Sequence, residues 1–149
     1  MKKIKVLFAL ICIALMATMT PLTSHAEDFS VGIEVAPSVI NLGSASPWVT
    51  VHTDITYDAV DSVSLNLYMD ESDELPSASI SPTLCFADER GDFVAKFDMK
   101  AVRTFINVTD KGRDSGKYIG FELTGQTASE SAENFSGRQE VLVFNNNKK

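Results

Sequence analysis

Apolar and polar residues alternate along most of the chain after residue 30. In VGIEV at 31–35, for example, Val31, Ile33 and Val35 fall on one side and Glu34 falls on the other. This period of two is typical of β-strands that rest one face on a core. The pattern recurs in seven segments, which are 31–35, 48–55, 63–69, 83–87, 93–97, 118–123 and 139–144. We therefore expect an all-β chain of about seven strands.

Proline and glycine residues punctuate this pattern and indicate turns between the strands. Pro37 is expected to end the first strand, and the apolar segment 39–42 can then pass from one sheet to another. The segment GSASP at 43–47 would turn the chain into the strand that begins at Trp48. The polar segment 124–137 is predicted to be a hairpin loop.

One segment, DMKAVRTFI at 98–106, follows a helical spacing instead. Asp98 can accept a hydrogen bond from the first turn and cap the helix. Four apolar residues then share one helical face, namely Ala101, Val102, Phe105 and Ile106. We expect a short helix that connects two strands.

The order of these motifs resembles the immunoglobulin-like modules found in secreted and surface proteins of bacteria and archaea. The residues that carry this resemblance are VAPSVINLGSASPWVTVHTDI, ADERGDFVAKFDMKAV, GKYIGFELTGQ and FSGRQEVLVF. The resemblance implies an immunoglobulin-like β-sandwich. It also implies an extracytoplasmic interaction or spacer module rather than a catalytic domain.

The start of the chain is typical of a secretory signal peptide. Three lysines precede the twelve apolar residues 6–17, which are too few for the roughly 20 that span a bilayer. The small residues Ser24 and Ala26 occupy the two positions that a signal peptidase recognises, so cleavage is expected after Ala26. The expected division is a leader at 1–26, a β-sandwich domain at 27–144 and a flexible polar tail at 145–149. A secreted or periplasmic location follows, with no membrane insertion after cleavage.

Removal of the leader makes the chain more acidic. Three of its 13 basic residues leave and all 20 acidic residues stay, so the net charge moves from −7 to −10. This charge disfavours nucleic acid as a partner. Cys85 is the single cysteine after residue 26, so no internal disulfide can form. Its apolar neighbours predict a buried, unreactive thiol.

His52 is the single histidine after residue 26, and it falls on the polar side of its strand. A hydrolase would need His52 to meet Cys85 or a serine within hydrogen-bonding distance. No sequence motif predicts such a meeting, so we expect no enzyme activity. A small hydrolase on a sandwich scaffold is the weakest of the alternatives.

Two acidic clusters are candidate cation sites. Asp88, Glu89 and Asp92 lie in the turn ADERGD, and a second cluster occupies 70–74. Calcium prefers six to eight oxygen ligands on a flexible loop, which such clusters supply in part. Arg90 places a positive charge among these carboxylates. We therefore favour a structural turn over a calcium site. No other cofactor is indicated.

Two tyrosines form a candidate ligand face. Tyr68 and Tyr118 oppose the inward residues of their strands, so both are expected to be exposed and able to stack on a sugar ring. Trp48 is expected to lie in the core. The sequence thus predicts an exported, non-catalytic binding or structural module whose partner is an unknown protein or a carbohydrate. A carbohydrate- or calcium-dependent adhesion domain is the alternative.

The leader can be tested by the intact mass of exported material. We expect a chain that starts at Glu27, because residues 1–26 carry the complete pattern of a cleaved leader. A chain that keeps Met1 and fractionates with membranes would contradict both the compartment and the net charge of the mature protein.

Overall fold

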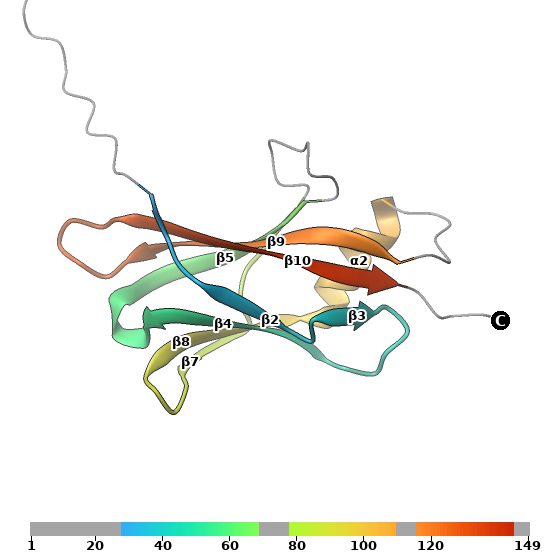
Figure 1. Ribbon diagram of the computed structural model, residues 1–149, viewed down its shortest axis with the longest axis horizontal. Helices are drawn as coiled ribbons and strands as arrows, with labels where there is room; N and C mark the ends of the chain where they lie inside the picture. The colour runs from blue at the N-terminus through green and yellow to red at the C-terminus, as the bar shows by residue number, and fades with distance from the viewer. Residues whose placement is uncertain (1–27, 69–77, 110–115, 145–149) are drawn as a thin grey trace, which may run out of the picture.

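The computed structural model describes residues 28–68, 78–109 and 116–144. Within them the chain is mostly β, with two sheets and one α-helix, α2 (Met99–Thr109) (Figure 1). The predicted leader, the acidic cluster at 70–74 and the predicted tail lie outside the described residues. No helix in the described part of the chain has the length and apolar character needed to cross a membrane.

Six strands form one sheet and four form the other, an arrangement consistent with the expected β-sandwich. The six-stranded sheet has the order β1-β10-β9-β5-β6, with β3 also paired to β10, and the four-stranded sheet has the order β2-β4-β8-β7. The strands are β1 (Phe29–Ser30), β2 (Ile33–Ala36), β3 (Val39–Asn41), β4 (Trp48–Thr56), β5 (Val60–Tyr68), β6 (Ala78–Ile80), β7 (Leu84–Ala87), β8 (Asp92–Asp98), β9 (Lys117–Thr127) and β10 (Asn134–Phe144). A 3-10 turn, η2 (Tyr57–Ala59), joins β4 to β5.

All seven expected strands are present, and β1, β3 and β6 are added to them. These three strands have two or three residues each. Segments of that length are too short to show a period of two, which is why a count from alternation was too low.

The first three strands cross between the sheets twice. β1 pairs in parallel with the start of β10, β2 pairs with β4 in the opposite sheet, and β3 returns to pair in parallel with the end of β10. This confirms the expected passage between sheets at 39–42 and the end of a strand before Pro37. Figure 1 shows the segment running along one side of both layers.

One side chain connects the two sheets at this side. Gln139 lies in β10 between the residues that pair with β1 and those that pair with β3. Its Oε1 accepts a hydrogen bond of 2.6 Å from the backbone N–H of Val35 in β2. Val35 is 1% exposed, so this amide needs a partner within the protein. Gln139 supplies it across the gap between the sheets.

The core lies between the two sheets and is continued by α2. It includes Val49, Val51, Ala95 and Phe97 from the four-stranded sheet, Leu65, Leu67, Ile119, Phe121 and Leu123 from the other, and Met99, Val102 and Ile106 from the helix. Trp48 is not part of it and is only half-buried. The expectation of a core tryptophan was wrong because Val49 takes the inward position, which turns Trp48 to the outer face.

The helix begins as expected. Asp98 Oδ1 accepts a hydrogen bond of 2.8 Å from the backbone N–H of Lys100, which caps the first turn. Val102 and Ile106 are buried on the face that the spacing predicted. The helix connects β8 to β9, so the predicted connecting helix is confirmed.

The same helix holds the turn before β4. Arg103 donates hydrogen bonds from its Nη2 to the backbone oxygens of Ser44 and Ser46. The N–H of Met99 donates to the carbonyl oxygen of Pro47 at 2.9 Å. The segment 43–47 is therefore a corner tied to the helix.

The predicted loop at 124–137 is much shorter in the structure. β9 continues to Thr127 and β10 starts at Asn134, so only residues 128–133 connect them. Four of the polar residues that suggested a loop lie instead on the outer face of the sheet, namely Thr124, Gln126, Asn134 and Ser136. Their inward neighbours are Gly125 and Phe135, and a Cβ at Gly125 would lie 2.4 Å from Cζ of Phe135. The missing side chain thus makes room for the ring.

Replacing Gln139 by methionine should destabilise the fold by about 1–3 kcal/mol, because the side chain keeps its approximate size but leaves the Val35 amide without its acceptor. Urea unfolding measures this loss. The same change at Gln126, which is exposed, should stay within about 0.5 kcal/mol of wild type. Equal effects at both positions would contradict a role for the bridge between the sheets.

Candidate functional site

The outer face of β5, β9 and β10 carries side chains with hydrogen-bonding groups in cross-strand register. Because alternate residues of these strands face the core, the remaining ones gather on the opposite face. Three rows of them are Ser62, Gln126 and Asn134, then Ser64, Thr124 and Ser136, then Asn66, Glu122 and Arg138. We refer to these nine residues as the polar lattice.

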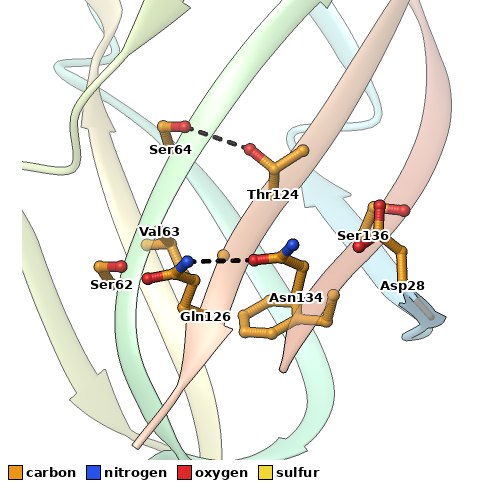
Figure 2. A pocket seen from close by; sticks show the side chains of 10 residues that line it. Asp28, Ser62, Val63, Ser64, Thr124, Gln126, Asn134 and Ser136 are labelled. Carbon is orange, nitrogen blue, oxygen red and sulfur yellow. Dashed lines mark hydrogen bonds between the residues drawn. The ribbon is translucent and has the colours of Figure 1, made fainter. Parts of the chain in front are cut away.

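The lattice is hollowed near the β9–β10 hairpin. A depression of about 380 Å³ opens there, and we call it the polar groove. Its lining consists of Asp28, Ser62, Val63, Ser64, Thr124, Gly125, Gln126, Asn134, Phe135 and Ser136. Figure 2 shows that hydroxyl and amide side chains from all three strands, and Asp28 from the chain before β1, surround it.

Hydrogen bonds between neighbours hold the groove side chains in place. The hydroxyl oxygens of Ser64 and Thr124 lie 3.2 Å apart, and Nδ2 of Asn66 donates to Oγ1 of Thr124 at 3.0 Å. Nε2 of Gln126 donates to Oδ1 of Asn134 at 3.1 Å (Figure 2). Each of these two amides has a second polar group, the Gln126 oxygen and the Asn134 amino group. The groove can therefore both donate to and accept from a ligand.

Sequence reasoning missed most of this groove. The predicted loop at 124–137 includes Gln126, Asn134 and Ser136. Alternation was not applied within this loop, so these residues were not placed on a strand. The available signal was the alternation itself: polar Thr124 and Gln126 flank a glycine, and polar Asn134 and Ser136 flank a phenylalanine. Two short alternating runs joined by a few residues indicate a hairpin.

Tyr68 lies farther along the same face, but it is only 9% exposed. Its hydroxyl donates to Oε2 of Glu122 at 2.7 Å, and the guanidinium carbon of Arg138 lies 4.7 Å from the centre of its ring. Gly120 makes this possible, because a Cβ there would lie 2.7 Å from Arg138 Nη2. Burial, then the hydrogen bond and charge of Glu122, raise the pKa of Tyr68 to about 12.

Tyr118 is 62% exposed on the same face of the sheet. It pairs with Leu142 of β10 and lies two residues before Gly120, the partner of Tyr68. The two tyrosines thus share a face, as expected, but the expectation that both are exposed was wrong for Tyr68 because Arg138 covers its ring. Their role as a ligand face stays a prediction.

The turn ADERGD connects β7 to β8 and is held by its own carboxylates. Oδ1 of Asp88 accepts hydrogen bonds from the backbone N–H groups of Arg90 and Asp92, at 2.8 and 3.0 Å. These bonds, the one from Asp92 above all, lower the pKa of Asp88. Gly91 has φ of +88°, the left-handed conformation that glycine adopts at little cost.

Arg90 also lies close to both acidic side chains of this turn. Its Nε is 3.6 Å from Oδ2 of Asp88 and 3.3 Å from Oδ2 of Asp92. Glu89 is exposed beside them. Among the described residues, no group of three or more His, Cys, Asp or Glu is arranged to hold a metal ion. A calcium site at Asp88, Glu89 and Asp92 stays a prediction, and the guanidinium between two of the carboxylates argues against it.

His52 and Cys85 face in opposite directions in the four-stranded sheet. His52 of β4 pairs with Val94 of β8, and Val94 also pairs with Phe86 of β7. Directly paired residues point to the same side of a sheet, so the His52 side chain lies on the outer face. Cys85 is the neighbour of Phe86 and faces the space between the sheets. It is half-buried rather than fully buried as expected, and burial raises the pKa of its thiol.

No protein-family model, curated protein or solved structure matches this chain. The resemblance to immunoglobulin-like surface modules therefore rests on the sequence motifs alone.

The Tyr68–Glu122 hydrogen bond gives a prediction about alkaline pH. Tyr68→Phe should lower the free energy of unfolding by about 1–2 kcal/mol near neutral pH, because a hydrogen bond to a carboxylate is lost. Above about pH 10 the unfolded chain loses the Tyr68 proton, whereas the folded chain keeps it up to about pH 12. The wild type should therefore lose stability in this interval and approach the variant. Denaturant unfolding of both proteins against pH measures the difference, and a constant difference would contradict the raised pKa.

Proposed function

We propose that the mature chain is an exported, non-catalytic binding module of the periplasm or the extracellular space. The proposal includes an immunoglobulin-like topology for the sandwich. The observation that carries it is the polar groove on the outer face of the six-stranded sheet. The lysine-led apolar start of the chain supports export.

The groove differs from an ordinary solvated face in the kind of side chain that it presents. Solvated sheet faces commonly carry long charged side chains, which lose considerable rotational freedom when a ligand orders them. Here short hydroxyl side chains and two amides line a depression, and hydrogen bonds such as Gln126–Asn134 already order them. Preordered groups lower the entropic cost of binding.

The chemistry of the groove favours a carbohydrate as its ligand. Hydroxyl and amide groups both donate and accept, so they match the hydroxyl groups of a sugar. Among the described residues, the groove lining contains no lysine or arginine, and its one carboxylate belongs to Asp28. A neutral glycan therefore fits the lining better than an acidic one.

Two other functions receive less support. A hydrolase using His52 and Cys85 would need the two side chains on one face, whereas they lie on opposite faces of a sheet. Calcium-dependent adhesion through Asp88 would have to displace Arg90 from the carboxylates of its turn.

Binding of the mature protein to immobilised neutral and acidic glycans tests the proposal. Replacing both Gln126 and Asn134 by alanine should weaken binding of a neutral glycan by at least about tenfold, since two or more hydrogen bonds of about 1 kcal/mol each are lost. The matched control replaces Thr50 and His52 on the outer face of the four-stranded sheet. The measurement is repeated in a chelator.

Each outcome has a distinct meaning. Loss of binding in the groove variant alone supports the glycan. Equal loss in both variants, or none in either, contradicts the groove, and loss in the chelator favours a calcium-dependent mechanism. If the mature protein binds none of the immobilised glycans, the carbohydrate assignment is wrong. Circular dichroism of each variant excludes unfolding as the cause.

A further inference from the structure

A second cavity opens at one end of the space between the two sheets. It lies where η2 crosses from β4 to β5, and its volume is about 490 Å³. The residues that define its character are Tyr57, Asp58, Asp61, Val63, Cys85 and Phe93. We call it the end cavity. Its volume falls in the range of about 300–1,000 Å³ that small-molecule sites occupy.

The end cavity adjoins the polar groove, and Ser62 and Val63 line both. Successive residues of a strand face opposite sides of the sheet. Ser62 belongs to the outer polar lattice, whereas the next residue, Val63, faces inward and packs against the core. The two sites differ in their other lining residues, since the aromatic ring of Tyr57 and the carboxylates of Asp58 and Asp61 belong to the end cavity alone.

Aromatic rings form a fixed wall of the cavity. The rings of Tyr57 and Phe93 are stacked, with centroids 5.9 Å apart and planes 16° from parallel. Phe93 is 3% exposed and belongs to the core, whereas Tyr57 is 37% exposed. The backbone N–H of Tyr57 donates to the carbonyl oxygen of Gly91 at 2.9 Å, which ties η2 to the turn between β7 and β8. One aromatic ring is thus held in position and accessible.

The charged residues that the structure places in the cavity lining all have one sign. Asp58 and Asp61 line the cavity and are exposed, and its lining in the described part of the chain includes no lysine, arginine or histidine. Val60, Val63 and Pro82 add apolar surface. An aromatic face and two carboxylates both attract a cation, and the apolar wall accommodates a hydrophobic body. The field of the mature chain, at net charge −10, has the same sign.

We propose that the end cavity binds a small organic cation, a protonated amine with an apolar or aromatic body, through Asp58, Asp61 and the Tyr57–Phe93 wall. The ammonium group lies at the carboxylates and the body lies against the rings. Cys85 lines the same cavity, so the rate at which its thiol is labelled can be used to detect a ligand there. This proposal does not rest on the function proposed for the polar groove.

Reaction of Cys85 with charged methanethiosulfonates tests the electrostatic part. The thiolate attacks the reagent sulfur and displaces a sulfinate, so one disulfide forms per chain. We compare the cationic 2-aminoethyl reagent with the anionic 2-sulfonatoethyl reagent, in the native protein and in the urea-unfolded chain. The cation-to-anion rate ratio should be higher in the native protein by on the order of tenfold, since a cleft of one charge sign concentrates counter-ions.

Charge variants identify which carboxylates are responsible. Asp58→Asn with Asp61→Asn should return the rate ratio close to that of the unfolded chain. Glu34→Gln with Glu140→Gln removes the same number of charges from exposed sites outside the cavity and should leave most of the preference. Equal effects of the two pairs, or no effect of Asp58 and Asp61, would overturn the proposal.

Protection of Cys85 by small molecules tests the ligand itself. The probes are 2-phenylethylamine, 2-phenylethanol and 3-phenylpropionate, which share an aromatic body and differ in charge. We expect the amine to slow labelling of the wild type most and to lose this advantage in the Asp58/Asp61 variant. Equal protection by all three probes, or protection by none, would contradict a cation site.

Discussion

The fold depends on how the open edge of β10 is closed. An unpaired strand edge leaves backbone groups exposed and invites pairing with other chains. Here β1 and β3 cover β10 in turn, and the hydrogen bond from Val35 to Gln139 joins the sheets where neither strand pairs with it. Because β10 in turn fixes the register of β9, and β9 that of β5, this closure also positions the outer polar lattice.

Strand β5 separates two environments that have different chemistry. On its outer side Ser62 and Ser64 join hydroxyl and amide groups that can exchange hydrogen bonds with a neutral ligand. On its inner side it borders a cavity with an aromatic wall and acidic residues, and Val63 lies at the boundary because it lines both sites. A shift of one residue in the register of β5 would turn its outward side chains inward and its inward side chains outward. The core packing that fixes this register therefore also determines which side chains line each site.

Alternation in the sequence was sufficient to predict the seven longer strands, while Pro37 with the apolar segment 39–42 predicted the passage between sheets and a helical spacing after Asp98 predicted the capped helix. It could assign a residue to a face but not its exposure there, which depends on neighbours distant in sequence. Tyr68 shows this clearly: its position on the outer face was predictable, but Arg138, which covers it, comes from another strand and needs Gly120 to do so. The end cavity was not predictable for the same reason, because Asp58, Cys85 and the ring of Phe93 meet only in the folded chain.

The acidic residues show why composition alone gives little information about function. In the sequence they form one negative excess, which disfavours nucleic acid as a partner but identifies no site. In the structure Asp54, Asp88 and Asp98 accept hydrogen bonds from backbone N–H groups, at Gly32, in the β7–β8 turn and at the start of α2. These carboxylates stabilise local structure. Asp58 and Asp61 instead line a cavity beside an aromatic ring, where a negative charge lowers the free energy of a bound cation. The position of a carboxylate, rather than the total charge, therefore determines which acidic residues are available to a ligand.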